Sequence, residues 1–450
     1  MSNKIQNGIQ RLLTPHASLH IDATTGIYNL VGFETAVQKA MRKKSSKEYM
    51  MIVFDLDKYN DLIHRYGYVM GDKLLRAVAV ATPFYMDKVI VARLERDKFV
   101  LYMECDTELL DETVLALEKI ISELHFEQFV GDIHLRMGGY KIPREQMQGD
   151  IHTLIDFAST AHCVAMRSQQ EHLVWYDERI RQMVEQEHYY HEHALGAIER
   201  EEFKLYLQPQ VNMSDTEHVC AEALVRWALP NGRIAYPESF VAHLEDSGVI
   251  AHLDFYMLRQ VCAFLKHHIE KGYRPFRISV NLSHVTLSIP DFAERFLQIV
   301  EESTVPHRYI GIEVHEASIV ALEERDLQKL VVLKKSGVII AVDAFASGYA
   351  SLRLLPTLPI DTIKLDRKYL RAYDADTRVR HIIASIIDLA HVLELQVICE
   401  GIEHQRDITL LQELGCDCIQ GYYLLRPVSC EEYIQNMDAS ARTFKQKIKG

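Results

Sequence analysis

The chain has 450 residues, of which 48% are hydrophobic and 25% are charged, and this composition is typical of a globular protein with room for two or three domains. Its formal net charge of −13 argues against the binding of a long nucleic acid by a generally basic surface. No apolar run has the length of a membrane span and the N-terminal stretch lacks an apolar signal core, so we expect a cytoplasmic protein without a membrane span.

After an N-terminal segment (1–20), residues 21–177 are predicted to form one mixed α/β domain. Short apolar runs predict its strands at 49–57, 88–94, 98–104 and 172–177. The second and third of these strands are joined by the tight turn ERD (95–97). Amphipathic stretches such as 71–82 and 108–125 predict helices around the strands.

Residues 178–202 carry apolar side chains at helical spacing among many charges. This spacing predicts a helix that joins the first domain to the rest of the chain. Such a helix is a stiff connector, and a stiff connector is able to carry a signal.

From residue 203 to about 440 the pattern changes to short apolar runs separated by amphipathic helical stretches. The runs are FKLYLQP, CAEALVRW, RISVNLS, YIGIEVHE, GVIIAVDAF, DTIKLD, LQVICEG and CIQGYYL. Strands that alternate with helices in this way predict a (β/α)8 barrel, a fold whose functional groups lie at the carboxyl ends of the strands.

Polar side chains stand at almost every one of these strand ends. They are Glu222, Asn281, Glu313, Asp343, Lys364, Glu400, Glu403 and Gln420. Carboxylates that converge on one mouth repel one another unless a cation lies between them. Because the group offers oxygen donors and contains no Cys or His, it favours Mg²⁺ or Mn²⁺ over zinc. Such a centre suits phosphoester chemistry, in which Lys364 would orient a water or neutralise charge and Arg226 would hold a phosphate.

These residues resemble the signature of the EAL-domain cyclic di-GMP phosphodiesterases. The resemblance begins at QPQ (208–210) and EALVRW (222–227), and it continues in order through VNLS, IEVHE, VDAFASGY, LPIDTIKLDR, CEGIEH and GCDCIQGYYLLRP. It covers roughly residues 195–435. It implies an enzyme that opens one phosphodiester of cyclic di-GMP to give pGpG with two Mg²⁺ or Mn²⁺ ions.

The resemblance also implies a role for each matching position. The first metal site would be made by Glu222, Asn281, Glu313 and Asp343. Asp343 would bridge to the second metal, with Glu400 nearby. The catalytic residues would be Lys364, Glu400 and Glu403, with Lys364 paired with the attacking water. The residues implied to bind the substrate are Gln208, Leu224, Arg226, Ser283 and Gln420. Glu316 would anchor the loop after Asp343, a region through which members of the family often pair as homodimers.

The loop after Asp343 departs from the family pattern. The usual run is Asp-Asp-Phe-Gly-Thr-Gly-Tyr, whereas this chain has Asp343-Ala344-Phe345-Ala346-Ser347-Gly348-Tyr349. Ala344 removes a ligand of the second metal, so we expect that site to be weak and the first site to be whole. Ala346 replaces a glycine that can adopt backbone angles other residues avoid.

The first domain resembles the GGDEF-domain diguanylate cyclases through residues 22–33, 54–72 and 93–102. Its hairpin reads Glu95-Arg96-Asp97-Lys98-Phe99 where that family has Gly-Gly-Asp-Glu-Phe. Glu95 and Arg96 would keep GTP phosphates from the backbone, and Lys98 replaces a metal-binding acid with a cation. We therefore expect a degenerate domain that makes no cyclic di-GMP.

Three functions are compatible with the sequence. The first is a receptor that binds cyclic di-GMP, hydrolyses it poorly or not at all, and signals to a protein partner of unknown identity. The second is a working phosphodiesterase, because every active-site position of the barrel other than Ala344 is present. The third, a scaffold that binds no nucleotide, gives no reason for Arg226 and a complete first metal site.

Overall fold

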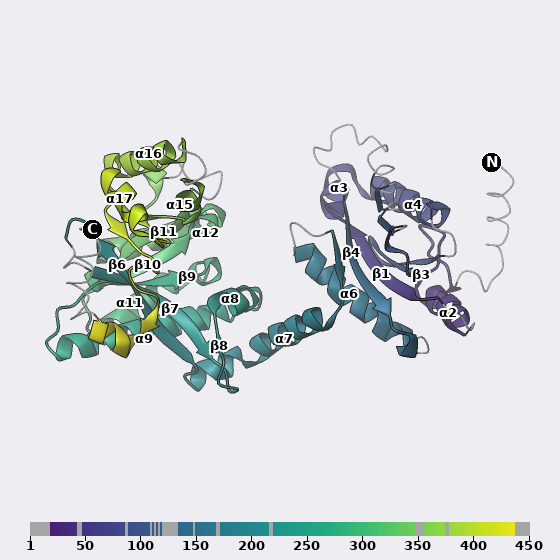
Figure 1. Cartoon of the computed structure of the whole chain (residues 1–450), viewed down its shortest axis with the longest axis horizontal. Helices are drawn as coiled ribbons and strands as arrows, with labels where there is room; N and C mark the ends of the chain where they lie inside the picture. Colours follow the sequence, from purple (N-terminus) through teal and green to yellow (C-terminus); the bar gives the residue numbers. More distant parts are fainter. Residues whose placement is uncertain are drawn as a thin grey trace. The chain divides into compact units, whose positions relative to one another are not determined.

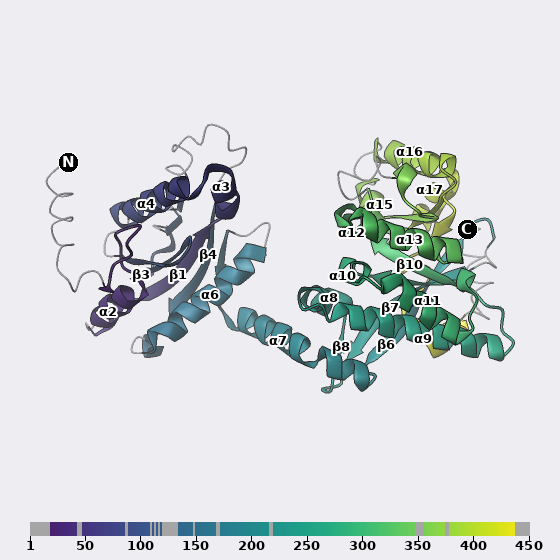
Figure 2. The ribbon, with the colours of Figure 1, turned by 180° about the vertical axis from the view of Figure 1, so that it is seen from behind.

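A computed structural model describes residues 19–436, apart from 43–46, 86–88, 109, 112–113, 116–117, 119–133, 147–148, 168–171, 216–218, 347–354 and 374–377. The chain divides into two compact units, Met1–Gln186 and Glu187–Gly450. In each unit a sheet is covered by helices (Figures 1 and 2).

The first unit is built on a five-stranded sheet with the strand order β2-β3-β1-β4-β5. The strands are β1 (Tyr49–Leu56), β2 (Ile90–Glu95), β3 (Lys98–Glu104), β4 (Leu135–Ile142) and β5 (Leu173–Trp175). Its helices are α2 (Leu30–Met41), α3 (Tyr59–Tyr66), α4 (Tyr68–Tyr85) and α6 (Ile151–Arg167), with a 3-10 turn at Arg144–Gln146. Strand β1 pairs antiparallel with both β3 and β4, while β4 and β5 are parallel.

Strand β1 is buried on both faces, and its side chains alternate between two cores. Met50, Ile52 and Phe54 pack in one core with residues of α3 and α4. Met51 and Val53 pack in the other core with residues of α2 and α6. Helices therefore cover both faces of the sheet (Figure 1).

The predicted strands of this unit are confirmed as β1, β2, β3 and β5, and the helix expected at 71–82 lies within α4. The helix expected at 108–125 falls largely outside the described residues. Strand β4 was not predicted from the sequence, because Gly138 and Gly139 interrupt its apolar pattern. A Cβ atom at Gly138 would lie 2.0 Å from the backbone nitrogen of His162, so the glycine lets α6 pack directly on the sheet.

The helix expected at 178–202 is α7 (Glu178–Glu199). Near its start, Ile180 packs with Ala161 and Val174 of the first unit. Further along, Tyr190 and Ala194 pack in an aromatic core of the second unit.

The second unit is a closed barrel of eight strands. They are β6 (Phe203–Asn212), β7 (Val219–Ala228), β9 (Ile278–Leu282), β10 (Ile310–His315), β11 (Ile339–Phe345), β12 (Thr362–Leu365), β13 (Gln396–Cys399) and β14 (Cys418–Ile419). Pairing of β6 with both β7 and β14 closes the ring, and the short strands β8 (Ile234–Ala235) and β15 (Val428–Ser429) extend it. All eight predicted apolar runs are confirmed as strands of this barrel.

The expected alternation of strand and helix fails at the first step of the barrel. Strand β6 runs antiparallel to both of its neighbours, and it is followed directly by β7. Only residues 213–218 separate the two strands, and a connection this short allows a hairpin, whereas parallel neighbours need a crossover of a dozen or more residues.

Helices enclose the barrel. They are α8 (Pro237–Asp246), α9 (Ile250–Glu270), α10 (His284–Leu287), α11 (Phe292–Ser303), α12 (Glu316–Ala321), α13 (Glu324–Ser336), α15 (Lys368–Tyr373), α16 (Arg378–Val392) and α17 (Gln405–Glu413), with 3-10 turns at His307–Tyr309 and Leu355–Thr357. Along β10, Ile312 and Val314 join the apolar core, and Glu313 between them points to the barrel interior. Within the described part of the chain, no helix combines the length and apolarity needed to cross a membrane.

Candidate functional site

A buried ammonium group lies at the centre of the barrel mouth. Lys364 on β12 has a side chain that is 1% exposed, and its Nζ lies 3.1 Å from Glu222 Oε2, 3.6 Å from Asp343 Oδ1 and 2.5 Å from Glu400 Oε1. It also donates a hydrogen bond to Glu313 Oε2. Four of the predicted site residues, each from a different strand or strand end, therefore meet around the ammonium of a fifth, Lys364.

The register of the parallel strands brings these side chains together. Glu313 lies beside Asn281 of β9 and beside Ala341 of β11. Asp343 is two residues beyond Ala341 and therefore shares its face of the strand, one step nearer the mouth. This stagger explains why Glu313 is fully buried while the Asp343 side chain is 25% exposed.

The electrostatics of the cluster follow from burial and charge. Burial alone would lower the pKa of Lys364, but the four carboxylates raise it well above its ordinary value. Burial and the charge of Glu222 raise the pKa of Glu313. Burial also raises the pKa of Glu400 to about 7, against the opposing effect of Lys364. The ammonium thus stays charged and is the counter-ion that permits several acids to share the mouth.

Side-chain amides hold the carboxylates in position. Asn281 Nδ2 donates to Glu222 Oε1 at 2.8 Å, and Gln420 Nε2 donates to Glu222 Oε2 at 2.6 Å. Gln210 Nε2 donates to Glu313 Oε1 at 3.0 Å and to Gln420 Oε1 at 3.0 Å. Gln420 also donates to Gln208 Oε1 at 3.0 Å, so the amides form one connected network under the mouth.

Two cavities open beside this cluster. The first, of about 190 Å³, is lined by Asp343, Glu400 and Glu403 and also by Arg367. The second, of about 390 Å³, is lined by Arg226, Ser283 and Asn281 among others. Both cavities share Gln208, Glu222, Leu224 and Tyr422 as lining residues. The structure therefore brings the predicted substrate-binding residues to the same mouth as the acids.

The guanidinium of Arg226 lies over two tyrosine rings. Its guanidinium carbon lies 5.5 Å from the ring centre of Tyr206 and 4.9 Å from that of Tyr236, distances at which a cation is attracted to a ring face. Its Nη1 donates to the Val225 carbonyl at 2.8 Å. The side chain is thus oriented in advance at the edge of the larger cavity.

Two acids that the sequence did not indicate support Ser283. Ser283 Oγ donates to Glu245 Oε1 at 2.6 Å, and its backbone nitrogen donates to Asp254 Oδ2 at 3.0 Å. Burial raises the pKa of Asp254 to about 7, although hydrogen bonds from Thr286 and Ser283 oppose the shift. Glu245 and Asp254 lie on α8 and α9, away from any strand end, so the strand-end rule could not find them. Gln210 lies in the QPQ stretch of the family resemblance, and this position is the sequence feature that indicates it.

The backbone after Asp343 is strained. Ala344 has φ 53° and Ala346 has φ 63°, both in the left-handed region that costs most residues roughly 1–2 kcal/mol. The pairing of β11 with β12 shifts register here, and the Ala344 nitrogen donates to Asp343 Oδ1 at 2.8 Å. Ala346 therefore keeps a backbone conformation suited to the glycine of the family pattern. Glu316 is buried in the first turn of α12, but most of the loop it was expected to anchor lies outside the described residues.

The donor chemistry of the mouth fits a hard divalent cation, and Lys364 already contacts the carboxylates that would hold one. Carboxylate and amide oxygens are the ligands that Mg²⁺ and Mn²⁺ prefer. Among the described residues, no group of three or more His, Cys, Asp or Glu side chains is arranged to hold a metal ion. The four carboxylates instead surround the ammonium of Lys364, with which they form ion pairs.

Charged side chains occupy the turn of the hairpin between β2 and β3, and one of them contacts α3. Arg96 has φ 45° at a position where the cyclase pattern has glycine, and its guanidinium donates to Asn60 Oδ1 at 2.7 Å. Lys98 Nζ lies 3.7 Å from Glu95 Oε1. Asp97 is partly buried, and burial together with the charge of Asp55 raises its pKa. The turn therefore carries charged side chains where a bare backbone would be needed to approach phosphates.

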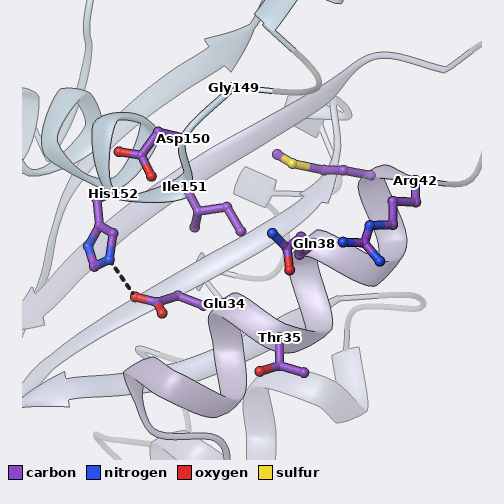
Figure 3. Close-up of a pocket in the computed structure, with 9 residues that line it drawn as sticks. Glu34, Thr35, Gln38, Arg42, Gly149, Asp150, Ile151 and His152 are labelled. Atoms are coloured by element: carbon purple, nitrogen blue, oxygen red, sulfur yellow. Dashed lines mark ion pairs between the residues drawn. The ribbon is translucent and has the colours of Figure 1, made fainter.

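A cavity of about 520 Å³ lies elsewhere in the first unit, between α2 and the start of α6 (Figure 3). Glu34 and His152 form an ion pair of 3.0 Å across it, and Arg42 and Asp150 also line it. None of the predicted site residues lies there, and its mixed charges indicate no particular chemistry.

Comparisons with known proteins agree with both resemblances. The EAL domain family matches residues 191–427, and the family described as "Diguanylate cyclase, GGDEF domain" matches residues 19–172. The protein named cyclic di-GMP phosphodiesterase NbdA, from Pseudomonas aeruginosa, is 26% identical over 448 residues, which cover 96% of this chain. The chain spans 57% of the length of that relative.

Two solved structures share parts of this fold. The PaMucR phosphodiesterase, in a c-di-GMP complex, is 27% identical with a TM-score of 0.51 over 54% of this chain and 99% of that one. The S helix-GGDEF-EAL part of Vibrio cholerae LapD, solved bound to c-di-GMP, has a TM-score of 0.59 over 93% of this chain and 99% of that one. At 18% identity, the second likeness concerns the fold alone.

Proposed function

The chain belongs to the EAL-domain family and carries a GGDEF domain ahead of its barrel, and from this premise we propose that it is a cyclic di-GMP signalling protein. In this proposal the barrel mouth binds cyclic di-GMP and hydrolyses it slowly or not at all. Binding of cyclic di-GMP would then be signalled to a protein partner.

The binding step is supported by the cavities at the mouth. Cyclic di-GMP carries two phosphates and two guanines, so its site needs cations as well as polar and apolar walls. Arg226 and Arg367 border the two cavities, and Leu224 lines both of them. The stacked Arg226 is oriented before a ligand arrives, which lowers the entropy lost on binding a phosphate.

Glu222, Asn281, Glu313 and Asp343 are the residues that would hold a first Mg²⁺ or Mn²⁺ ion. When bound, this ion would supply charge for the phosphate oxygens and acidify a water. Lys364 and Glu400 lie 2.5 Å apart at the mouth, where they can orient a water and take its proton. Attack of that water on phosphorus would break one P–O bond, and the released ribose oxygen would take up a proton to give pGpG.

A single observation carries the receptor part of the proposal, namely Ala344 next to Asp343. Its methyl group offers no oxygen to a second cation, and its backbone nitrogen already donates to Asp343 Oδ1. Without the second ion, one stabiliser of the charge that develops in the transition state is missing. Binding is affected less, because Arg226 and Ser283 do not depend on Ala344.

A second candidate, a working phosphodiesterase, is favoured by the cluster around Lys364. Glu222, Glu313, Asp343 and Glu400 all lie near one buried ammonium, so the acids and the cation that hydrolysis needs are in place. Incubation of the full chain with cyclic di-GMP and Mn²⁺, followed by chromatography of the products, separates the two candidates. Binding without pGpG indicates a receptor, while steady formation of pGpG indicates an enzyme.

We also propose that the GGDEF domain makes no cyclic di-GMP. The side chains of Glu95 and Arg96 stand where the family uses glycine, and Arg96 donates a hydrogen bond to Asn60 on α3. Lys98 adds a positive charge where an acid would help to hold a metal. The domain would then serve as a structural or regulatory module.

A further inference from the structure

We propose that the ammonium group of Lys364 competes with the divalent cation for one set of carboxylate oxygens, so that a metal ion enters the mouth only by displacing it. The inference deepens the proposed function, on which it rests. Lys364 would then have two roles: it pairs with the attacking water, and it sets the affinity of the site for the metal ion.

The ion pairs of Lys364 carry the argument. Its Nζ contacts Glu222, Glu313, Asp343 and Glu400, three of which are the candidate carboxylate ligands of the first metal and one of the second. The Lys364 side chain is 1% exposed and that of Glu313 is fully buried. A divalent ion among the same oxygens would lie within a few ångströms of the ammonium, and two cations so close repel strongly where water is scarce.

The carboxylates have supports that do not depend on Lys364. Asn281 and Gln420 each donate to Glu222, and Gln210 donates to Glu313. The set of oxygens is therefore held by amides on the barrel strands. Lys364 reaches it at the end of a long flexible side chain. When the two cations compete, the ammonium is the part that moves.

The direction of this movement follows from the exposure of its partners. Glu222 and Glu313 are buried beneath the mouth, whereas the side chains of Asp343 and Glu400 are 25% and 27% exposed. A displaced ammonium keeps most of its ion pairing if it moves outward toward Glu400. This is also the place from which it would act on the attacking water.

The inference is tested by the affinity for Mn²⁺ alone, measured by calorimetry on the full chain without nucleotide. Lys364→Met keeps the length of the side chain and removes its charge, so Mn²⁺ should bind at least tenfold more tightly than in the parent. The matched control is Lys329→Met, which removes an ammonium paired with Asp326 at 2.6 Å on α13. Its affinity for Mn²⁺ should stay within twofold of that of the parent.

The outcomes separate this inference from the proposed function. If the parent binds Mn²⁺ and a folded Lys364→Met variant binds it equally or more weakly, the competition is refuted and the metal site stands. If neither the parent nor the variants take up Mn²⁺, the metal-dependent function and the inference fall together.

A second measurement needs no variant. Lys364 is buried, so an amine-acetylating reagent should modify it slowly, and mass spectrometry can assign the modification to this residue. Saturation of the parent with Mn²⁺ should speed acetylation of Lys364 several-fold, because the ammonium moves toward the mouth, while acetylation of Lys329 should not change. An unchanged rate at Lys364 in the saturated protein would overturn the displacement.

Discussion

Replacement of Ala344 by Asp is the sharpest test of how the mouth works. The substitution adds a carboxylate next to Asp343, whose own Oδ1 lies 3.6 Å from Lys364 Nζ. The new carboxylate would stand at the position next to Asp343, where the family pattern has a ligand of the second metal. In the proposed function, the substitution would restore that ligand and leave the groove residues Arg226 and Ser283 unchanged.

The backbone conformation sets the expected change in the free energy of unfolding, and the missing charge sets the expected change in kcat. Ala344 has φ 53°, and Asp is several-fold enriched over most residues in this left-handed region, so the variant should fold with a free energy of unfolding at least equal to that of the parent. Loss of one group that stabilises developing charge typically lowers kcat by about 10² to 10³. Restoring a metal ligand should therefore raise kcat for cyclic di-GMP by about 10², with little change in its binding constant.

The assay measures pGpG formed with Mn²⁺ by parent and variant under saturating substrate. Ala346→Gly is the matched control, because it removes the strain at φ 63° in the same loop and adds no ligand. It should raise the free energy of unfolding by about 1 kcal/mol and leave kcat within twofold. Equal turnover by the parent and Ala344→Asp, or an equal gain from Ala346→Gly, would refute the account of the missing ligand.

Three further predictions concern the groove and the first unit. Arg226→Lys should weaken cyclic di-GMP binding about tenfold, because an ammonium lacks the forked donors and the flat stacking face of a guanidinium. Unchanged affinity in calorimetry would exclude Arg226 as the phosphate contact. GTP incubated with the full chain should give no cyclic di-GMP, and any product that Asp97→Ala abolishes would mean that the cyclase site is active. Burial would lower the pKa of His162, but Asp55 at 3.2 Å and Cys163 raise it to about 8. Because this pKa exceeds the unfolded value of about 6.5, the charged imidazole should stabilise the first unit by about 1–2 kcal/mol. The stabilisation should be complete below about pH 6.5 and be lost as the pH rises through 8. Urea unfolding at several pH values should detect this dependence, and His162→Gln should remove it.

Local patterns in the sequence were sufficient for most of the barrel. The apolar runs from β9 to β13 were recognisable because each is short, continuous and bounded by helical stretches, as in strands covered by helices. The polar residues that close those runs, such as Asn281, Glu313 and Asp343, followed from the rule that functional groups lie at strand ends. The identity of Ala344 was also enough to predict the loss of a ligand.

Other features depended on contacts between distant parts of the chain. Gly138 and Gly139 weakened the strand signal of β4, and their use became clear only when α6 was seen to pack on them. The antiparallel direction of β6 depends on which strands close the ring. Glu245 and Asp254 reach Ser283 from two helices that are 29 or more residues away in the chain.

The sequence by itself determined which residues are able to perform chemistry here, because side-chain types and their strand-by-strand spacing can be read from the chain. Only the tertiary structure decided that Lys364 lies among four acids and that Ala344 and Ala346 hold left-handed backbone angles. The physical reason is that periodicity reports the face of a strand on which a residue lies. The partner that it meets depends on barrel closure and on the stagger between strands, which are properties of the whole fold.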